Sequence, residues 1–74
     1  MYEMYDKVIE LYPDYEKAWY NKGVLFHGIG KNKDALKMYD KTIKLKPDFS
    51  DALNNKGLIF QSNGKHKEAI KIFD

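Results

Sequence analysis

The sequence lacks cysteine and arginine, and it contains no long apolar run. Without cysteine, neither disulfides nor thiolate metal sites support the fold. All 13 basic residues are lysine, whereas arginine is preferred for bidentate contacts with phosphates and base edges. No segment approaches the roughly 18 apolar residues that span a bilayer. The first ten residues, MYEMYDKVIE, also carry acidic side chains that a signal peptide excludes. We therefore expect a soluble, cytoplasmic protein with no membrane partner and no nucleic-acid partner.

The chain has 74 residues, and 13 basic and 11 acidic side chains give a net charge of +2. This length allows one small domain, so we predict a single domain over residues 1–74. A chain of this size buries only about 60% of its unfolded surface, which leaves its core little reserve.

What the chain does contain is an internal repeat. The stretch NKGVLF at residues 21–26 recurs as NKGLIF at residues 55–60. When Asn21 is aligned with Asn55, nearly half of the aligned residue pairs along the chain are identical. A fixed period of this length is typical of repeat architectures, in which each unit is one supersecondary motif.

Each unit contains two stretches with helical periodicity. The first, Tyr15–Gly28, places Trp19, Gly23 and Phe26 on one face, and the second covers Asn32–Lys46. The second places Ala35, Leu36, Tyr39, Ile43 and Leu45 inward.

Both stretches have recognisable ends. Asp14 and Asp48 each follow a proline, and we expect them to cap the helices that come next. Gly28 and Gly30 are expected to end the first helix, and Gly64 to end its counterpart. Because glycine is unfavourable inside a helix, we expect Gly23 to face Ala35 and let two helices approach closely.

The spacing of these residues resembles the tetratricopeptide repeat, a helical hairpin of about 34 residues. The matching positions are Trp19, Lys22, Gly23, Phe26, Ala35, Tyr39 and Pro47 in one unit, and Leu53, Lys56, Gly57, Phe60, Ala69 and Phe73 in the next. Lys22 and Lys56 stand where the family usually has leucine. We expect their stems to lie along apolar surface with the ammonium groups in water.

The resemblance implies an all-α fold of antiparallel helix-turn-helix hairpins, stacked as a fragment of a right-handed superhelical α-solenoid. In this frame, residues 1–12 form the second helix of a partial repeat and residues 16–46 a complete helix pair. Residues 50–74 form a first helix and a truncated second helix. Such repeats bury their faces by stacking, so we expect a homo-oligomer that associates through its end helices.

The resemblance also implies a protein-interaction module. First helices of this family line a concave groove that holds a peptide or a partner helix. The equivalent residues here are Lys17, Tyr20, Asn21, Val24, His27, Asp51, Asn54, Asn55, Leu58 and Gln61. Asn21 and Asn55 could bond the backbone of a bound peptide, one amide per repeat. Alternatively, these two asparagines bond neighbouring helices.

Catalytic chemistry finds little support in the sequence. His27 and His66 lie far apart in the chain without a carboxylate motif, and the stretch GIGK at residues 28–31 lacks the rest of a phosphate-binding loop. We therefore predict no enzyme activity, no cofactor and no metal site. Two other functions remain open, a self-assembling structural scaffold and RNA binding, and the near-neutral charge disfavours the second.

Overall fold

The computed structural model describes residues 2–62, which form four α-helices. Helix α1 covers Tyr2–Leu11, α2 covers Glu16–Gly28, α3 covers Asn32–Leu45 and α4 covers Ser50–Ser62. Within this part of the chain there is no strand, and no helix is long and apolar enough to cross a membrane. The all-α prediction is confirmed, and the ends of α2 and α3 agree to within one residue with those expected from the periodicity.

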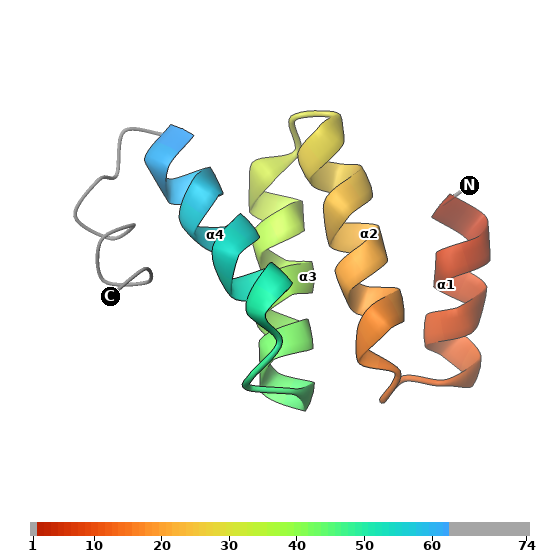
Figure 1. Cartoon of the computed structure of the whole chain (residues 1–74). Coiled ribbons are helices and arrows are strands. Elements are labelled where there is room, and N and C mark those ends of the chain that lie inside the picture. The colour runs from red at the N-terminus through yellow and green to blue at the C-terminus, as the bar shows by residue number, and fades with distance from the viewer. Residues whose placement is uncertain (1, 63–74) are drawn as a thin grey trace.

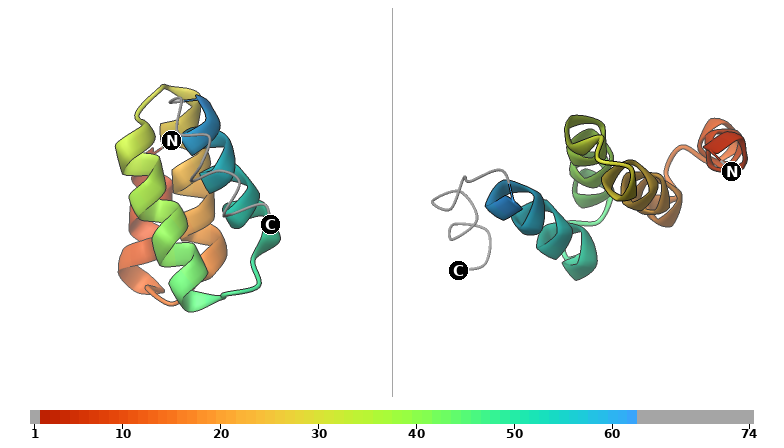
Figure 2. Two further views of the ribbon diagram at one scale, coloured as in Figure 1. Left: turned by 90° about the vertical axis from the view of Figure 1, so that its left-hand side faces the viewer. Right: turned by 90° about the horizontal axis from the view of Figure 1, so that it is seen from above.

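The four helices lie side by side in chain order (Figure 1). Helix α2 packs against α3 over most of their shared length, α3 also packs against α4, and α1 lies against α2. Successive helices run in opposite directions because short turns connect them (Figures 1 and 2). This arrangement is a stack of helical hairpins, and α3 lies between the two first helices α2 and α4.

The end of α2 is fixed by backbone hydrogen bonds around Gly30. The amide of Lys31 donates to the Phe26 carbonyl at 2.9 Å, and the amide of Gly30 donates to the His27 carbonyl at 3.1 Å. This pair of bonds is the Schellman motif, which requires a left-handed residue after the helix. Gly30 supplies it with a φ of 81°. The prediction that glycine ends this helix is therefore confirmed.

The predicted cap at Asp14 is wrong. Tyr15 occupies the N-cap position of α2 and makes no side-chain capping bond. The chain turns before the helix, because the Tyr15 amide donates to the Tyr12 carbonyl at 3.0 Å. The Trp19 indole also donates to the Pro13 carbonyl at 2.8 Å and holds this turn. In the next unit α4 begins at Ser50, so Asp48 also lies two residues before the first helical residue.

The core forms where α3 meets α2 and α4. Ala35, Tyr39, Ala52 and Ile59 are fully buried there, and Thr42 is buried beside them. The Thr42 hydroxyl donates to the Met38 carbonyl at 2.9 Å, so burying this polar group leaves no unpaired donor. The small alanines let the helices approach, and Tyr39 fills the space between them.

Gly23 makes room for Tyr39 and not for Ala35, which corrects the sequence prediction. A Cβ atom at Gly23 would lie 2.7 and 2.8 Å from two ring carbons of Tyr39 and 3.2 Å from the Cβ of Met38. These separations are too short for carbon atoms in contact. Glycine is therefore needed on α2 because the Tyr39 ring passes directly over its backbone.

An ion pair occurs twice with the period of the repeat. Lys22 on α2 pairs with Asp6 on α1, and Lys56 on α4 pairs with Asp40 on α3 at 2.6 Å. The lysine and the aspartate of the second pair each lie one repeat further along the chain than those of the first pair. The sequence did not predict that each of these ammonium groups bonds an exposed carboxylate of the preceding helix. Lys22 also lies over the Phe26 ring, 5.6 Å from its centre.

Two predictions lie outside the described residues. They are the helix end at Gly64 and the truncated second helix that reaches Asp74.

Candidate protein-binding groove

The ten predicted groove residues lie on α2 and α4, five on each helix. Within each helix they recur every three or four residues, so they share one face. Seven of them are exposed: Lys17, Asn21, Val24, Asp51, Asn54, Leu58 and Gln61. The other three, Tyr20, His27 and Asn55, are partly buried and turn toward α3. The face therefore combines exposed polar and apolar side chains with a few inward-turned ones.

The inward-turned side chains form one hydrogen-bonded group with Tyr39, here called the polar cluster: Tyr20, His27, Tyr39 and Asn55. The Asn55 amide donates to the Tyr20 hydroxyl at 3.1 Å and to the Tyr39 hydroxyl at 3.4 Å. The Tyr39 hydroxyl lies 3.5 Å from Nδ1 of His27, with the two rings edge to face. The polar cluster joins α2, α3 and α4.

Aromatic packing holds Tyr20 in the polar cluster. Its ring centre lies 5.8 Å from that of Tyr39 and 5.0 Å from that of Phe49, and both pairs are tilted. Tilted pairs at this separation are favourable arrangements of aromatic quadrupoles. Phe49 precedes α4, so the Tyr20 ring is held by contacts with α3 and with the residue before α4.

The hydrogen bonds of Asn55 leave a defined acceptor and donor at the surface. A carboxamide has two N–H groups, and Asn55 gives them to the two tyrosines. Its Oδ1 accepts no hydrogen bond from residues 2–62. Tyr20 accepts from Asn55 and keeps its own hydroxyl proton to donate. The α2–α4 face thus presents one acceptor and one donor next to each other.

Burial raises the pKa of the Tyr39 phenol above its usual range, and the nearby Tyr20 adds to the rise. The hydrogen bond from Asn55 acts in the opposite direction on this pKa. Desolvation is the largest effect, since it disfavours the phenolate. At neutral pH Tyr39 is therefore an uncharged hydroxyl that can accept from Asn55 and donate to Nδ1 of His27.

The two repeat asparagines have different roles in the structure. Asn55 bonds neighbouring helices, which is the alternative that the sequence left open. Asn21 is exposed, and its side chain makes no hydrogen bond within residues 2–62. Tyr5 stands at the position equivalent to Tyr39, yet no bond joins it to Asn21. Of these two asparagines, Asn21 is the one that offers its whole amide to a ligand.

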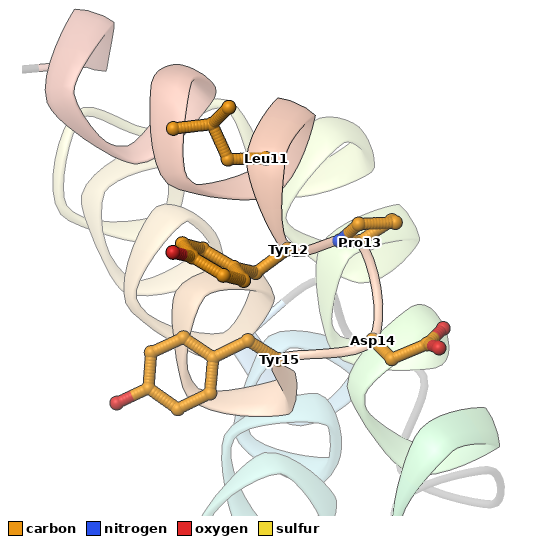
Figure 3. A pocket seen from close by; sticks show the side chains of 5 residues that line it. All are labelled: Leu11, Tyr12, Pro13, Asp14 and Tyr15. Carbon is orange, nitrogen blue, oxygen red and sulfur yellow. The ribbon is translucent and has the colours of Figure 1, made fainter.

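One hollow lies away from the predicted groove residues, at the turn between α1 and α2. It is open, has a volume of about 560 Å³ and is lined by Leu11, Tyr12, Pro13, Asp14 and Tyr15 (Figure 3). Figure 3 shows the side chains of Leu11, Tyr12 and Tyr15 extending to one side of the turn. Sequence reasoning missed this surface. The equivalent turn has a smaller hollow beside Phe49, whose ring is covered by Tyr20.

The polar cluster does not assemble a metal centre. Within residues 2–62, no group of three or more histidine, cysteine or acidic residues could hold an ion. His27 contacts tyrosine and not a second ligand. What the α2–α4 face offers is neutral hydrogen-bonding groups and exposed apolar side chains, which are suited to binding rather than to ion coordination.

Comparisons with known proteins agree with this geometry. Two family models described as tetratricopeptide repeat match residues 16–49 and 38–71. The chain belongs to the tetratricopeptide repeat family. As a member of this family it is a helical repeat of the protein-interaction and scaffold type. No curated protein sequence matches the chain.

Two solved structures are similar to the chain over nearly its full length. A crystal structure of MamA aligns with a TM-score of 0.93 and 32% identity, covering 97% of this chain and 42% of that one. A crystal structure of MamA protein aligns with a TM-score of 0.91 and 32% identity, covering 97% and 39%. The chain thus spans about two fifths of the length of these relatives.

Proposed function

We propose that this tetratricopeptide repeat protein binds an extended peptide segment along the face shared by α2 and α4. The observation that carries the proposal is the Tyr20–Asn55 hydrogen bond, which joins the two helices at 3.1 Å. It leaves the Tyr20 hydroxyl as a donor beside the Oδ1 acceptor of Asn55. A peptide group carries the complementary pair, one carbonyl and one N–H.

An extended peptide fits this pair better than a partner helix does. In a helix, backbone N–H and carbonyl groups bond one another and are not available to side chains. In an extended segment they point outward and need partners. The exposed amide of Asn21 can serve a second peptide group, so a bound segment would follow the line from α4 to α2.

Two apolar side chains add contacts for the side chains of the peptide. Val24 and Leu58 occupy equivalent positions of the two repeats and are 41% and 47% exposed. Covering such groups with an apolar peptide side chain contributes about 25 cal/mol per Å². We therefore expect the groove to select peptides with apolar side chains and an accessible backbone.

The proposal is tested by selecting binders from a random library of short displayed peptides and measuring the affinity of a selected peptide by fluorescence anisotropy. The variant Val24→Ser/Leu58→Ser should lower this affinity about tenfold through lost apolar contact. The control Met4→Ser/Leu11→Ser truncates two exposed apolar side chains elsewhere and should leave the affinity unchanged. Equal losses in both variants, or none in the first, would contradict the proposal.

The hydrogen-bonding part of the proposal needs a separate variant. Tyr20→Phe keeps the ring that packs on Phe49 and removes only the hydroxyl. We expect a several-fold loss of peptide affinity with unchanged helix content by circular dichroism, because one hydrogen bond contributes about 1 kcal/mol. Asn55→Ala is unsuited to this test, since Asn55 also holds three helices together.

A second function, self-association, is favoured by the apolar surface of α1 and the turn after it. Met4, Leu11 and Tyr12 are 67%, 59% and 64% exposed. Large side chains gathered on one part of a small protein are typical of interaction sites. Under this alternative the chain is a scaffold, and the surface of α1 contacts a second copy.

Sedimentation equilibrium over a wide concentration range tests the alternative. Tyr12→Lys is the informative variant, because lysine already occupies the equivalent position 46 of the other repeat and suits the fold. If copies associate through this surface, the variant should weaken association while Val24→Ser does not. A wild-type chain that stays folded and monomeric at high concentration contradicts self-association and leaves peptide binding as the function.

The remaining predictions rest on the sequence. They are a cytoplasmic location, the lack of catalysis, and the lack of nucleic-acid and membrane partners, and they stay predictions.

A further inference from the structure

Helix α3 carries a row of lysines on the side away from the core. Lys33, Lys37, Lys41 and Lys44 follow one another at spacings of four, four and three residues, so they lie on one helical face. Lys33, Lys37 and Lys44 are exposed, and Lys41 is partly covered, with its ammonium 5.5 Å from the centre of the Trp19 ring. We call these four residues the lysine row.

The charges of the lysine row are not balanced within the described structure. None of the four ammonium groups forms an ion pair with any of residues 4–62. Asp40 lies on the same face, but Lys56 of α4 already occupies its carboxylate at 2.6 Å. Asp34, the other acidic residue of α3, lies toward the edge of this face and is partly buried. The result is a local positive surface on a chain with a net charge of only +2.

The fold does not require lysine at these positions. Two positions of the row, 37 and 44, correspond in the repeat to Glu3 and Glu10 on α1. The same helix position therefore accepts either sign of charge. Toward the C-terminus, the sequence again has lysine at the equivalents of Lys33 and Lys37, which are Lys67 and Lys71. A basic outer face is a property of particular units.

We propose that the lysine row is a second interaction surface, which binds an acidic α-helical segment of a partner protein. Carboxylates on a partner helix that recur at three- and four-residue intervals would face successive lysines of the row. Opposite charges placed in this way along two helices select partner and orientation, as they do at the flanking positions of coiled coils. By helical spacing the lysine row lies on the opposite side of α3 from Tyr39 of the polar cluster, so both surfaces can be occupied together.

The chemistry of the row favours an acidic helix over two other anionic partners. Nucleic-acid surfaces combine basic residues with stacking aromatic side chains or arginine, and the row is lysine with its one neighbouring indole covered by Lys41. Amphipathic membrane-surface helices carry large apolar residues beside their lysines, whereas the apolar residues of α3 are turned into the protein core.

The test measures binding of a fluorescent synthetic helix that has glutamate at three- and four-residue spacing on one face and alanine elsewhere. A peptide of the same composition with glutamates spread around the helix is the first control. We expect tighter binding of the one-sided peptide, with affinity that falls steeply between low and physiological salt, because exposed charges are screened over about 10 Å at 0.1 M. Equal binding of the two peptides would overturn the proposal.

Two charge-matched variants separate the row from net charge. Lys33→Glu/Lys37→Glu should lower affinity for the one-sided peptide at least about tenfold, because attraction becomes repulsion at two contacts. Lys7→Glu/Lys46→Glu changes the net charge equally at exposed positions outside the row and outside the predicted groove, and it should change affinity less than about threefold. Equal losses would show that net charge alone acts and would overturn the proposal.

Two further probes test the choice of partner. Vesicles of phosphatidylcholine and phosphatidylserine and a single-stranded thymidine oligonucleotide are titrated under the same conditions. Binding of either one that is tighter than the one-sided peptide and lost in Lys33→Glu/Lys37→Glu would overturn the acidic-helix assignment. Weaker binding of both supports it.

Discussion

At the scale of single residues, Tyr39 connects the fold to the candidate site. Its ring is fully buried and lies directly over the backbone of Gly23, while its hydroxyl reaches Asn55 and His27. A phenol combines a large apolar body with one polar end, so it can fill a core and still take part in a surface network. The packing of α2 on α3 therefore determines the position of the Tyr39 hydroxyl relative to Asn55 and His27.

The buried phenol makes stability depend on alkaline pH. Because burial raises the pKa of Tyr39, the unfolded chain loses this proton first as the pH passes about 10. The free energy of unfolding should therefore be unaffected by this group below pH 10 and fall from there through the raised pKa. At neutral pH the free energy of unfolding of Tyr39→Phe should be about 1 kcal/mol lower than that of the wild type, because its hydrogen bonds are missing. Above pH 10 the variant should not show the decrease that ionisation of Tyr39 causes in the wild type.

Urea denaturation at several pH values between 7 and 11 checks this expectation. The difference in unfolding free energy between wild type and Tyr39→Phe should shrink as the pH rises, while the effects of the other tyrosines and the lysines cancel. A difference that is constant with pH would mean that Tyr39 ionises equally in both states.

Gly23 gives a second residue-scale prediction. Gly23→Ala gains about 1 kcal/mol of helix propensity but forces a Cβ atom to within 2.7 Å of the Tyr39 ring. Overpacking of this kind costs about 1–3 kcal/mol, and a fully buried ring cannot move aside, so we expect a net loss of stability. Gly28→Ala is the matched control on the same helix, because no atom lies within 4 Å of its Cβ position.

Thermal melting of the two glycine variants gives opposite signs if this view is correct. Gly28→Ala should melt at or above the wild-type temperature and Gly23→Ala below it. Equal stabilisation of both variants would show that the Tyr39 ring can shift without cost.

The sequence predicts the candidate site only in part at this scale. Helical spacing places all ten groove residues on one face of their helices, and this follows from the repeat alone. It does not distinguish Asn21 from Asn55, each of which begins the same triplet Asn-Lys-Gly. The difference arises because Asn55 meets Tyr20, a residue of the preceding unit, at a distance that only the packing of three helices determines.

At the scale of helices, the position of each element follows closely from the sequence, but the details of its start do not. Glycine ends α2 as expected, since only a left-handed residue completes the backbone bonds there. The start differs because Tyr15 replaces Asp14 as the N-cap. Its equivalent, Phe49, packs on Tyr20 while Tyr15 lines an open hollow, so the two helices begin at equivalent positions with or without this aromatic contact.

The repeated ion pairs give the element-scale prediction. Asp40→Asn removes the carboxylate that Lys56 contacts between α3 and α4. Because the Asp40 side chain is 57% exposed, we expect a loss of less than about 1 kcal/mol, which disappears near 1 M salt through screening.

Asp48→Asn is the control, since Asp48 is exposed and forms no ion pair with residues 2–62. Urea titrations of both variants at low and high salt provide the measurement. A loss for Asp40→Asn that persists at high salt would indicate a structural role other than charge attraction.

At the scale of the whole molecule, the polar cluster predicts that α2, α3 and α4 unfold together. Repeat proteins can unfold unit by unit, because each unit contacts only its neighbours. Here Asn55 bonds side chains of both α2 and α3, so losing α4 also breaks the contacts of the preceding pair.

Two probes of one urea titration check this cooperativity. Trp19, the single tryptophan, reports on α2 by its fluorescence, and far-ultraviolet circular dichroism reports on all helices. Coincident midpoints and slopes are expected for a single transition. In Asn55→Ala the two curves should separate, with circular dichroism changing first; coincident curves in that variant would show that the cluster does not couple the helices.

The general architecture could be predicted at this scale because the period of the repeat carries both the helix lengths and their order. The candidate binding surfaces could not be predicted from the sequence, because they depend on which side chains of neighbouring units come into contact. The hollow at the first turn is an example. Tyr15 and Phe49 are equivalent aromatic residues, yet one lines an open surface and the other lies against Tyr20.

The ion pairs between helices also give the stack a direction. Each of the two lysines, Lys22 and Lys56, reaches back to an aspartate of the helix before it, so a unit presents a cation toward the preceding unit and an anion toward the following one. Turning a unit around would bring lysine to lysine and aspartate to aspartate. The interface between units therefore favours stacking in one orientation, because the reversed orientation places like charges opposite each other.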